Sequence, residues 1–378
     1  MSSVFLVVGA RPNFMKIAPL YKRLNAVPGI DAQIVHTGQH YDDAMSEVFF
    51  RQLGLPQPQI SLTVGSAPHG AQTGRVLERF ESALIEHRPS AVVVVGDVNS
   101  TLACALATAK LQYSDGSRPL LAHVEAGLRS GDRSMPEEVN RVLTDAISDM
   151  LFTTEEGAAT NLLRENVPAA RIHFVGNVMI DCLIDAWPHI ENRRAWADLG
   201  LAPHTYGLVT LHRPSNVDEP KGLADVVSTL TRIARHLPLV FPVHPRTRER
   251  LESAGMNESS GIRLTGPLGY FEFISLVSAA RIVLTDSGGV QEESTFLHVP
   301  CLTLRDNTER PVTISHGTNT LVGSRPIDLA STALETLARH DSAAPAPPLW
   351  DGRASHRIAE VLCAAMLRRS DAPVGLAQ

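Results

Sequence analysis

The sequence is poor in cysteine and has no surplus of positive charge. Its four cysteines, spread over 378 residues, show no CxxC spacing, which argues against a disulfide framework. We therefore expect buried, reduced thiols in a cytoplasmic protein. The net charge of −6 argues against nucleic acid as the main partner.

Long apolar segments are also missing. No stretch approaches the roughly twenty apolar residues that a membrane span needs, so no membrane partner is expected. The N-terminus, MSSVFLVVGA, lacks the basic region of a signal peptide. Its short apolar run therefore predicts a first strand.

Motifs typical of cofactor and metal sites are absent. The first predicted strand is not followed by GxGxxG, which argues against a dinucleotide cofactor. The chain has no HExxH motif, and no DxD pair follows a predicted strand. Its candidate histidines are dispersed, and taken singly they fit structural roles better than metal ligation: His36, His40, His123, His212 and His244. We therefore expect neither a cofactor nor a metal.

What the sequence does contain is an alternation of apolar strands and amphipathic helices, over a chain too long for one core. The predicted strands are residues 4–8, 32–36, 91–95, 120–122, 150–153 and 172–175, then 207–211, 239–243, 281–285 and 300–304. This pattern predicts an α/β protein of two Rossmann-like, doubly wound domains. We place the first domain at 1–176, the second at 177–352 and a C-terminal helix within 353–378.

Carboxylates follow two strands of the first predicted domain. Asp97 comes directly after the strand 91–95, and Glu125 follows the apolar segment 120–122. Ligands of open α/β sheets bind at this edge, so both are candidate functional acids. Pro136 suits the first turn of a helix, where Glu137 and Arg141 are spaced to form a pair. Ordinary first-turn acids remain an alternative, most of all for Glu138.

Two strand-to-helix turns are candidate anion sites. In the second half, Ser287-Gly288-Gly289 allows close approach of the backbone to a phosphate, and the following helix presents free N–H groups. Glu293 is placed to accept ribose hydroxyls, and Arg310 and His212 also follow strands. In the first half, Gly9-Ala10-Arg11-Pro12 opens a helix that carries Lys16. Together these residues favour a nucleoside diphosphate ligand, although a plain βα turn with surface cations remains an alternative for Arg11 and Lys16.

Ordered motifs run along most of the chain: GARPNFMKIAPL, TGQH, GDVNSTLA, HVEAGLRS, MPEEVNR, TLHRPSN, FPVHPRTR, LTDSGGVQEE and RDNTERPVT. They resemble those of the non-hydrolysing UDP-N-acetylglucosamine 2-epimerase family. The resemblance implies the glycosyltransferase-like GT-B fold, with a cleft between two Rossmann-like domains and the C-terminal helix returning to the first. It also implies a UDP-sugar substrate, no cofactor and a homodimer.

The resemblance also implies a chemistry and roles for named residues. UDP leaves by anti elimination to give 2-acetamidoglucal, and its return after reprotonation gives UDP-N-acetylmannosamine. Asp97, Glu125 and Glu137 are the acid/base candidates, with His212 also in the catalytic set. The matching nucleotide-binding positions are Arg11, Lys16, Arg141, Ser287, Gly288, Gly289, Glu293 and Arg310, with Phe273 near the uracil.

Alternatives remain at this stage. A hydrolysing 2-epimerase would release N-acetylmannosamine and UDP, and a relative acting on a modified UDP-sugar would share most motifs. The segment SGDRSM between Arg129 and Pro136 is shorter than in many bacterial relatives, and HPRTR replaces HLNP at His244. A GT-B glycosyltransferase is a third alternative, which the acid-rich first half disfavours.

Overall fold

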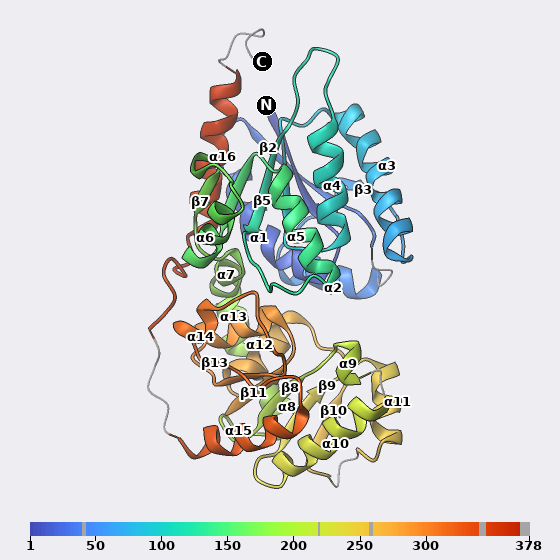
Figure 1. The fold of residues 1–378 in the computed structure, drawn as a ribbon, viewed down its shortest axis with the longest axis vertical. Coiled ribbons are helices and arrows are strands. Elements are labelled where there is room, and N and C mark those ends of the chain that lie inside the picture. The colour runs from blue at the N-terminus through green and yellow to red at the C-terminus, as the bar shows by residue number, and fades with distance from the viewer. Residues whose placement is uncertain (40–42, 218–219, 257–259, 340–344, 371–378) are drawn as a thin grey trace. The chain divides into compact units, whose positions relative to one another are not determined.

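The computed structural model describes residues 1–39, 43–217, 220–256, 260–339 and 345–370. His40 therefore lies outside the described residues. Contacts between Cα atoms divide the chain into unit 1, Met1–Asp185 with Pro348–Gln378, and unit 2, Ala186–Pro347. Each unit is built around its own parallel sheet (Figure 1).

Unit 1 contains a seven-stranded sheet in the order β3-β2-β1-β4-β5-β6-β7. All its neighbouring strands are parallel. The strands are β1 (Ser2–Val8), β2 (Ile30–His36), β3 (Ile60–Ser61), β4 (Ala91–Val95), β5 (Leu120–Ala126), β6 (Met150–Thr153) and β7 (Ile172–Phe174). Its helices are α1 (Arg11–Asn25), α2 (Asp43–Gln52), α3 (His69–His87), α4 (Asn99–Lys110), α5 (Pro136–Ile147), α6 (Glu156–Arg164), the 3-10 helix η1 (Ala169–Arg171) and α16 (Ala354–Ser370).

Unit 2 contains a six-stranded parallel sheet in the order β10-β9-β8-β11-β12-β13. Its strands are β8 (Gly207–Thr210), β9 (Leu239–Pro242), β10 (Ile262–Thr265), β11 (Ile282–Thr285), β12 (Cys301–Thr303) and β13 (Asn319–Leu321). The helices are α8 (Ala195–Asp198), α9 (Pro214–Val217), α10 (Pro220–Ala234), α11 (Pro245–Ser253), α12 (Tyr270–Ser278), α13 (Gly288–Phe296), α14 (Val312–Ser315) and α15 (Pro326–Ala338). Helix α7 (Val178–Arg193) runs from unit 1 into unit 2.

The strand orders confirm the predicted doubly wound α/β fold. In each sheet the order reverses once, between β1 and β4 in unit 1 and between β8 and β11 in unit 2. Such a switch point is where open α/β sheets bind ligands, because the loops after the two strands diverge there. The loops after β1, β4, β8 and β11 carry Gly9, Asp97, His212 and Ser287 respectively.

The sheets are buried on both faces, which explains their sequence. Every residue of β4, AVVVV, is buried, and so is every residue of β5. Continuous apolar strands are typical of a parallel sheet covered by helices on both sides. The strands that sequence reasoning missed, β3, β10 and β13, are all at sheet edges. They are short and only partly buried, so they carry no long apolar run.

The unit boundaries differ from those expected at 176/177 and 352/353. The first half of α7 belongs to unit 1 because Asp181 joins it to α16. Its carboxylate accepts hydrogen bonds from the backbone N–H groups of Ala354 (3.1 Å) and Ser355 (2.7 Å) at the start of that helix. Helix α16 packs against α1. Residues 371–378 of the predicted C-terminal segment lie outside the described residues.

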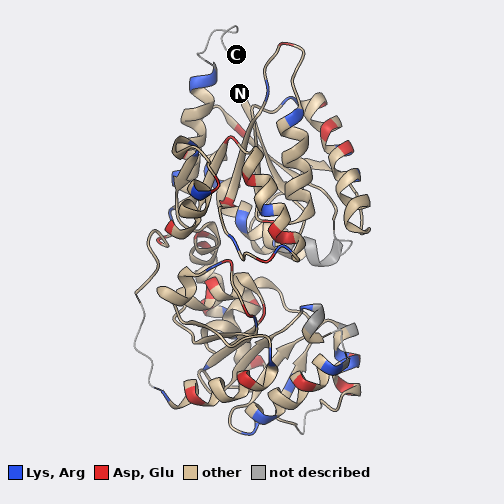
Figure 2. Cartoon of the chain, viewed as in Figure 1, with Lys and Arg blue, Asp and Glu red and all other residues tan. Residues whose placement is uncertain are grey.

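Charged residues of both signs are interspersed along each unit (Figure 2), in keeping with the small net charge. Among the described residues, no helix is both long and apolar enough to cross a membrane.

Candidate functional site

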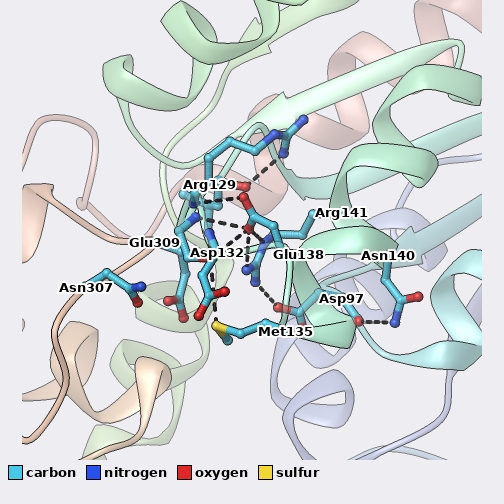
Figure 3. A network of polar contacts seen from close by, with 12 residues as sticks. Asp97, Arg129, Asp132, Met135, Glu138, Asn140, Arg141, Asn307 and Glu309 are labelled. Atoms are coloured by element: carbon cyan, nitrogen blue, oxygen red, sulfur yellow. Dashed lines mark hydrogen bonds and ion pairs between the residues drawn. The ribbon is translucent and has the colours of Figure 1, made fainter. Parts of the chain in front are cut away.

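The loop after β4 places Asp97 at the carboxyl edge of the first sheet. Gly96 turns the chain there in the left-handed region, with φ +67°. The Asp97 carboxylate, 27% exposed, forms an ion pair with Arg141 of α5. Asn140 of the same helix donates a hydrogen bond to the Asp97 carbonyl oxygen at 2.8 Å (Figure 3). Helix α5 therefore holds both the backbone and the side chain of Asp97.

Glu125 lies beside this loop, at the end of β5, and forms a buried ion pair with Lys16 of α1. Its φ of 73° is unusual for a residue with a side chain. The register between β5 and β6 shifts at this point, between Val124 and Ala126. Backbone strain of this kind costs roughly 1–3 kcal/mol and clusters at functional sites.

Gly96, whose positive φ favours glycine, lies close to the Lys16–Glu125 pair. A Cβ built on Gly96 would lie 2.8 Å from the Lys16 ammonium nitrogen and 3.7 Å from a Glu125 carboxylate oxygen. The loop that carries Asp97 thus passes directly over the Lys16–Glu125 pair. The structure places Lys16 against this carboxylate, and its expected role toward the nucleotide stays a prediction.

The expected pair between Glu137 and Arg141 is wrong. Arg141 pairs instead with Glu138, whose Oε2 accepts from the guanidinium at 2.7 Å (Figure 3). Glu138 also accepts the backbone N–H groups of Ser130 and Gly131, each at 3.0 Å. Burial alone would raise the pKa of Glu138, but these bonds outweigh burial and hold the pKa below its ordinary value.

Glu137 faces the other way, because neighbouring residues of a helix point about 100° apart. It is exposed in the first turn of α5. Sequence reasoning gave Glu138 even weight as an ordinary first-turn acid and so missed its position. The signal that could have found it is its spacing of three residues from Arg141, which is as suitable for pairing as the spacing of four.

In unit 2, Asp286 follows β11 and orients the loop after β8. It accepts the backbone N–H groups of His212 (3.0 Å) and Arg213 (2.9 Å), and the side-chain amide of Asn216 (2.8 Å). Burial would raise the pKa of Asp286, but its bonds to His212, Arg213 and Asn216 outweigh burial and lower that pKa. Sequence reasoning assigned no role to this residue.

The same carboxylate fixes the His212 ring. Nδ1 of His212 lies 2.8 Å from Oδ1 of Asp286, while the side chain remains 65% exposed. Because the carboxylate is ionised, Nδ1 carries a proton and donates it to Asp286. The exposed side of the ring is then left for a ligand.

The start of α13 gathers the predicted phosphate-binding residues. Ser287 is its N-cap residue, and Gly288 begins the helix. The guanidinium of Arg310 lies against Gly288, so a side chain at that position would collide with it. A helix N-terminus beside a buried guanidinium is suited to bind an anion.

Carboxylates keep Arg310 in place. Its Nε lies 3.0 Å from Oε1 of Glu292 in α13, and Nη1 forms an ion pair with Glu309. Neither glutamate was predicted. Glu293, the predicted ribose partner, is buried on the same helix, and Phe273 lies half-buried on α12. The side chain of Arg11 lies outside the described part of the chain, although its backbone begins α1.

The two groups of residues have complementary chemistry. Unit 1 offers acids at the ends of β4 and β5, while unit 2 offers a helix N-terminus and a cation. Among the described residues, no cluster of three His, Cys, Asp or Glu side chains is suited to a metal ion.

Comparison with known proteins gives the family. The family model for UDP-N-acetylglucosamine 2-epimerase matches residues 22–363. The UDP-N-acetylglucosamine 2-epimerase of Methanocaldococcus jannaschii is 41% identical, over 94% of this chain and 98% of its own length. A UDP-2,3-diacetamido-2,3-dideoxy-D-glucuronate 2-epimerase of Pseudomonas aeruginosa is also 41% identical, over 95% of this chain and 99% of its own.

Solved structures agree with this assignment. The Methanocaldococcus jannaschii epimerase in complex with UDP-GlcNAc and UDP matches with a TM-score of 0.86 and 40% identity, over 96% of this chain and 99% of that one. The predicted GT-B-like, two-domain α/β fold is therefore confirmed. These matches show that this chain belongs to the UDP-N-acetylglucosamine 2-epimerase family.

Proposed function

We propose that this chain interconverts UDP-N-acetylglucosamine and UDP-N-acetylmannosamine by inverting carbon 2 of the sugar. Family membership supports the reaction class, which is that of an isomerase. The proposal is supported by the acids at the carboxyl edge of the sheet in unit 1 and by the helix N-terminus at the carboxyl edge of the sheet in unit 2. The acids at the ends of β4 and β5 suit proton transfer, and the α13 turn with Arg310 suits a diphosphate.

The proposed path is an elimination followed by an addition. A base removes the proton of carbon 2, and that electron pair forms the double bond to carbon 1. The bond from carbon 1 to oxygen breaks, and its electrons leave with UDP, giving 2-acetamidoglucal. UDP then returns to carbon 1 while a proton reaches carbon 2 on the opposite face. The path consumes no electrons from outside, so it needs no hydride carrier.

The candidate acid/base residues differ in how far existing contacts already occupy their carboxylates. Glu138 is fully occupied as an acceptor, so we give it a structural role. Asp97 is partly exposed and forms an ion pair with Arg141, and its exposed carboxylate suits a base. Glu125 shares a buried pair with Lys16, whose ammonium group is a proton source. Glu137 keeps the acid/base role that the resemblance gives it.

In unit 2 we propose that the N-terminal turn of α13 and Arg310 bind the diphosphate. The exposed side of His212 lies on the loop after β8, the neighbour of β11 in the sheet, and is proposed to contact the same group. Glu293 is proposed to accept the ribose hydroxyls and Phe273 to contact the uracil. The remaining predicted nucleotide contacts are Arg11, Lys16, Arg141, Ser287, Gly288 and Gly289.

A modified sugar is the second candidate substrate. The Pseudomonas aeruginosa relative, which is named for a diacetamido-glucuronate nucleotide, is as similar to this chain as the archaeal UDP-N-acetylglucosamine 2-epimerase. Sequence identity therefore does not distinguish the two candidate sugars as substrates, whereas an assay of both UDP-sugars distinguishes them.

The test is incubation with each UDP-sugar in heavy water, followed by proton NMR. Deuterium at carbon 2 with UDP-N-acetylmannosamine accumulating is the expected result. If only the diacetamido-glucuronate nucleotide is turned over, that nucleotide is the substrate in place of UDP-N-acetylglucosamine. Free N-acetylmannosamine would show a hydrolysing enzyme, and an absence of exchange with both sugars would contradict the proposed function.

We further propose that the protein is a homodimer that packs through α5. This helix buries its polar residues, including Glu138, Arg141 and Asp145. Its opposite face exposes apolar side chains, among them Val139 (37%) and Leu143 (46%). An exposed apolar face of this kind is typical of a protein interface. A second copy supplies a matching face, because the two surfaces of a twofold interface are the same patch.

We also propose a cytoplasmic location. Cys104, Cys182, Cys301 and Cys363 are all free thiols. Free cysteines persist in reducing compartments such as the cytoplasm.

A further inference from the structure

His123 of β5 is buried at the centre of unit 1, between two acceptors. Its Nδ1 lies 2.6 Å from Oδ1 of Asp145, near the end of α5. Its Nε2 lies 2.8 Å from the carbonyl oxygen of Gly96. From the sequence alone this histidine fits a structural role, and the proposed reaction does not use it.

The partners determine where the protons of the ring are. A carbonyl oxygen only accepts, so Nε2 must carry a proton. Asp145 is an ionised carboxylate, because its other oxygen accepts the Gly127 N–H at 3.0 Å and pairs with Arg129 at 2.7 Å. Burial would raise the pKa of Asp145, but the charges and hydrogen bonds of His123 and Arg129 outweigh burial and lower that pKa. An ionised carboxylate also only accepts, so Nδ1 carries a proton as well.

The charges around the ring balance. Asp145 faces His123 and Arg129, and Arg129 also pairs with Glu165 at 2.7 Å. The cluster thus contains an imidazolium and a guanidinium against two carboxylates. A buried imidazolium is tolerable here because each of its N–H groups has a partner.

These contacts fix the backbone segments that carry Asp97 and Glu125, the proposed acid/base residues. The Gly96 carbonyl directly precedes Asp97, and the Gly127 N–H lies two residues after Glu125. Asn140 and Arg141, which hold Asp97 itself, belong to the same helix as Asp145. The His123–Asp145 pair therefore links the end of β4, the end of β5 and α5.

We propose that His123 is a positioning residue for the epimerisation, held as an imidazolium between Asp145 and the Gly96 carbonyl so that the backbone carrying Asp97 and Glu125 stays fixed. The inference rests on the proposed function for its catalytic consequence. The protonation of the ring can be tested without any turnover.

The first test uses protein labelled with nitrogen-15 in its histidines. The expected spectrum, recorded at pH 8, shows both ring nitrogens of His123 protonated, because each of them faces an acceptor. The signal is assigned by its loss in His123→Gln. A His123 ring with one unprotonated nitrogen at pH 8 would overturn the imidazolium, whether or not the protein proves to be an epimerase.

The second test compares two substitutions kinetically. His123→Gln keeps a donor for the Gly96 carbonyl, whereas His123→Phe fills the space without one. We expect kcat to fall by about tenfold or more in His123→Gln and further in His123→Phe, with the Kd for UDP within about twofold of wild type. If packing alone matters, Phe is the better replacement, so a kcat for His123→Phe equal to or above that of His123→Gln would overturn the proposal.

A matched control is available on the same sheet. His173 of β7 packs against Phe152 away from these carboxylates, with ring centroids 5.5 Å apart. His173→Gln is expected to leave kcat within about twofold of wild type. Should the His123 variants not fold, Asp145→Asn provides the alternative. It removes the charge opposite the ring, and unchanged kcat in that folded variant would also overturn the proposal.

Discussion

Lys16 and Glu125 form a buried ion pair between the first turns of α1 and the end of β5. The pair joins the glycine turn after the first strand to the acid-bearing strand of the same sheet. Because both side chains are almost fully removed from water, each charge depends on the other. This pair therefore offers a direct test of how the site is stabilised.

Removing one charge of the pair is expected to destabilise the protein. Lys16→Met leaves the Glu125 carboxylate buried and is expected to lower the free energy of unfolding by about 3–5 kcal/mol. The double variant Lys16→Met/Glu125→Gln removes both charges, so it is expected to recover most of that stability but not the activity. Urea unfolding followed by circular dichroism measures both.

The matched control for this cycle is Lys22, which pairs with Asp185 at 3.1 Å. The side chains of Lys22 and Asp185 are both largely exposed, so Lys22→Met is expected to lower the free energy of unfolding by less than about 1 kcal/mol. If Lys16→Met lowers the free energy of unfolding no more than Lys22→Met does, the buried pair contributes no more stability than the exposed pair.

Asp97 is expected to act in catalysis rather than in binding the nucleotide. Asp97→Asn removes the proton acceptor beside Arg141 and is expected to lower kcat roughly 100- to 10,000-fold. UDP affinity by calorimetry is expected to stay near the wild-type value, because Asp97 is not among the proposed nucleotide contacts. Asp115→Asn, at an exposed turn paired with Arg88, is the control. Wild-type turnover in Asp97→Asn would remove this residue from the site.

Glu293 is expected to bind the ribose of UDP. Glu293→Ala is expected to weaken UDP binding about tenfold, or about 1.4 kcal/mol, through the loss of the acceptor for the two hydroxyls. Calorimetric titration with UDP measures the change, and thermal unfolding checks that the variant is folded. Glu335→Ala on α15 is an exposed control. An unchanged affinity in a folded Glu293→Ala protein would refute the ribose contact.

Stability is expected to fall on acidification. The pKa values of Glu138, Asp145 and Asp286 are all lowered in the folded protein. The unfolded chain then binds more protons than the folded one, so their contribution is present above the ordinary carboxyl pKa of about 4 and is lost as the pH falls through the lowered values. Urea unfolding at pH 7, 5 and 3.5 should therefore show a decrease concentrated in the last interval.

A single variant isolates one of these groups. Asp286→Asn keeps the shape of the side chain but cannot ionise, so its unfolding free energy should change less between pH 5 and 3.5 than that of the wild type. An identical pH dependence in the two proteins would show that Asp286 is not a source of the acid sensitivity.

The dimer proposed through α5 is expected to dissociate when its apolar face is charged. Leu143→Glu places a carboxylate on that face, and sedimentation velocity should then show a monomer where the wild type is a dimer. Ile327→Glu, at an exposed position of α15 in unit 2, should leave the assembly unchanged. A monomeric wild-type protein, or a dimer that persists in Leu143→Glu, would contradict the proposed interface.

The sequence predicted the fold because its strands are nearly continuous apolar runs. The run AVVVV at 91–95 matches β4 residue for residue. Parallel strands bring their carboxyl ends to one edge of a sheet, so Asp97 and Glu125 could be placed there from their positions alone. The edge strands β3, β10 and β13 were not predicted, because a short, half-buried strand has no long apolar run in its sequence.

Only the tertiary structure decided which charged groups meet. Glu137 and Glu138 are both spaced to pair with Arg141 within α5, and the burial of one face of the helix selects Glu138. His123 and Asp145, Lys16 and Glu125, and His212 and Asp286 are each far apart in the chain. Local spacing reports contacts within one helix or strand, whereas these pairs depend on how separate elements pack, which no local pattern encodes.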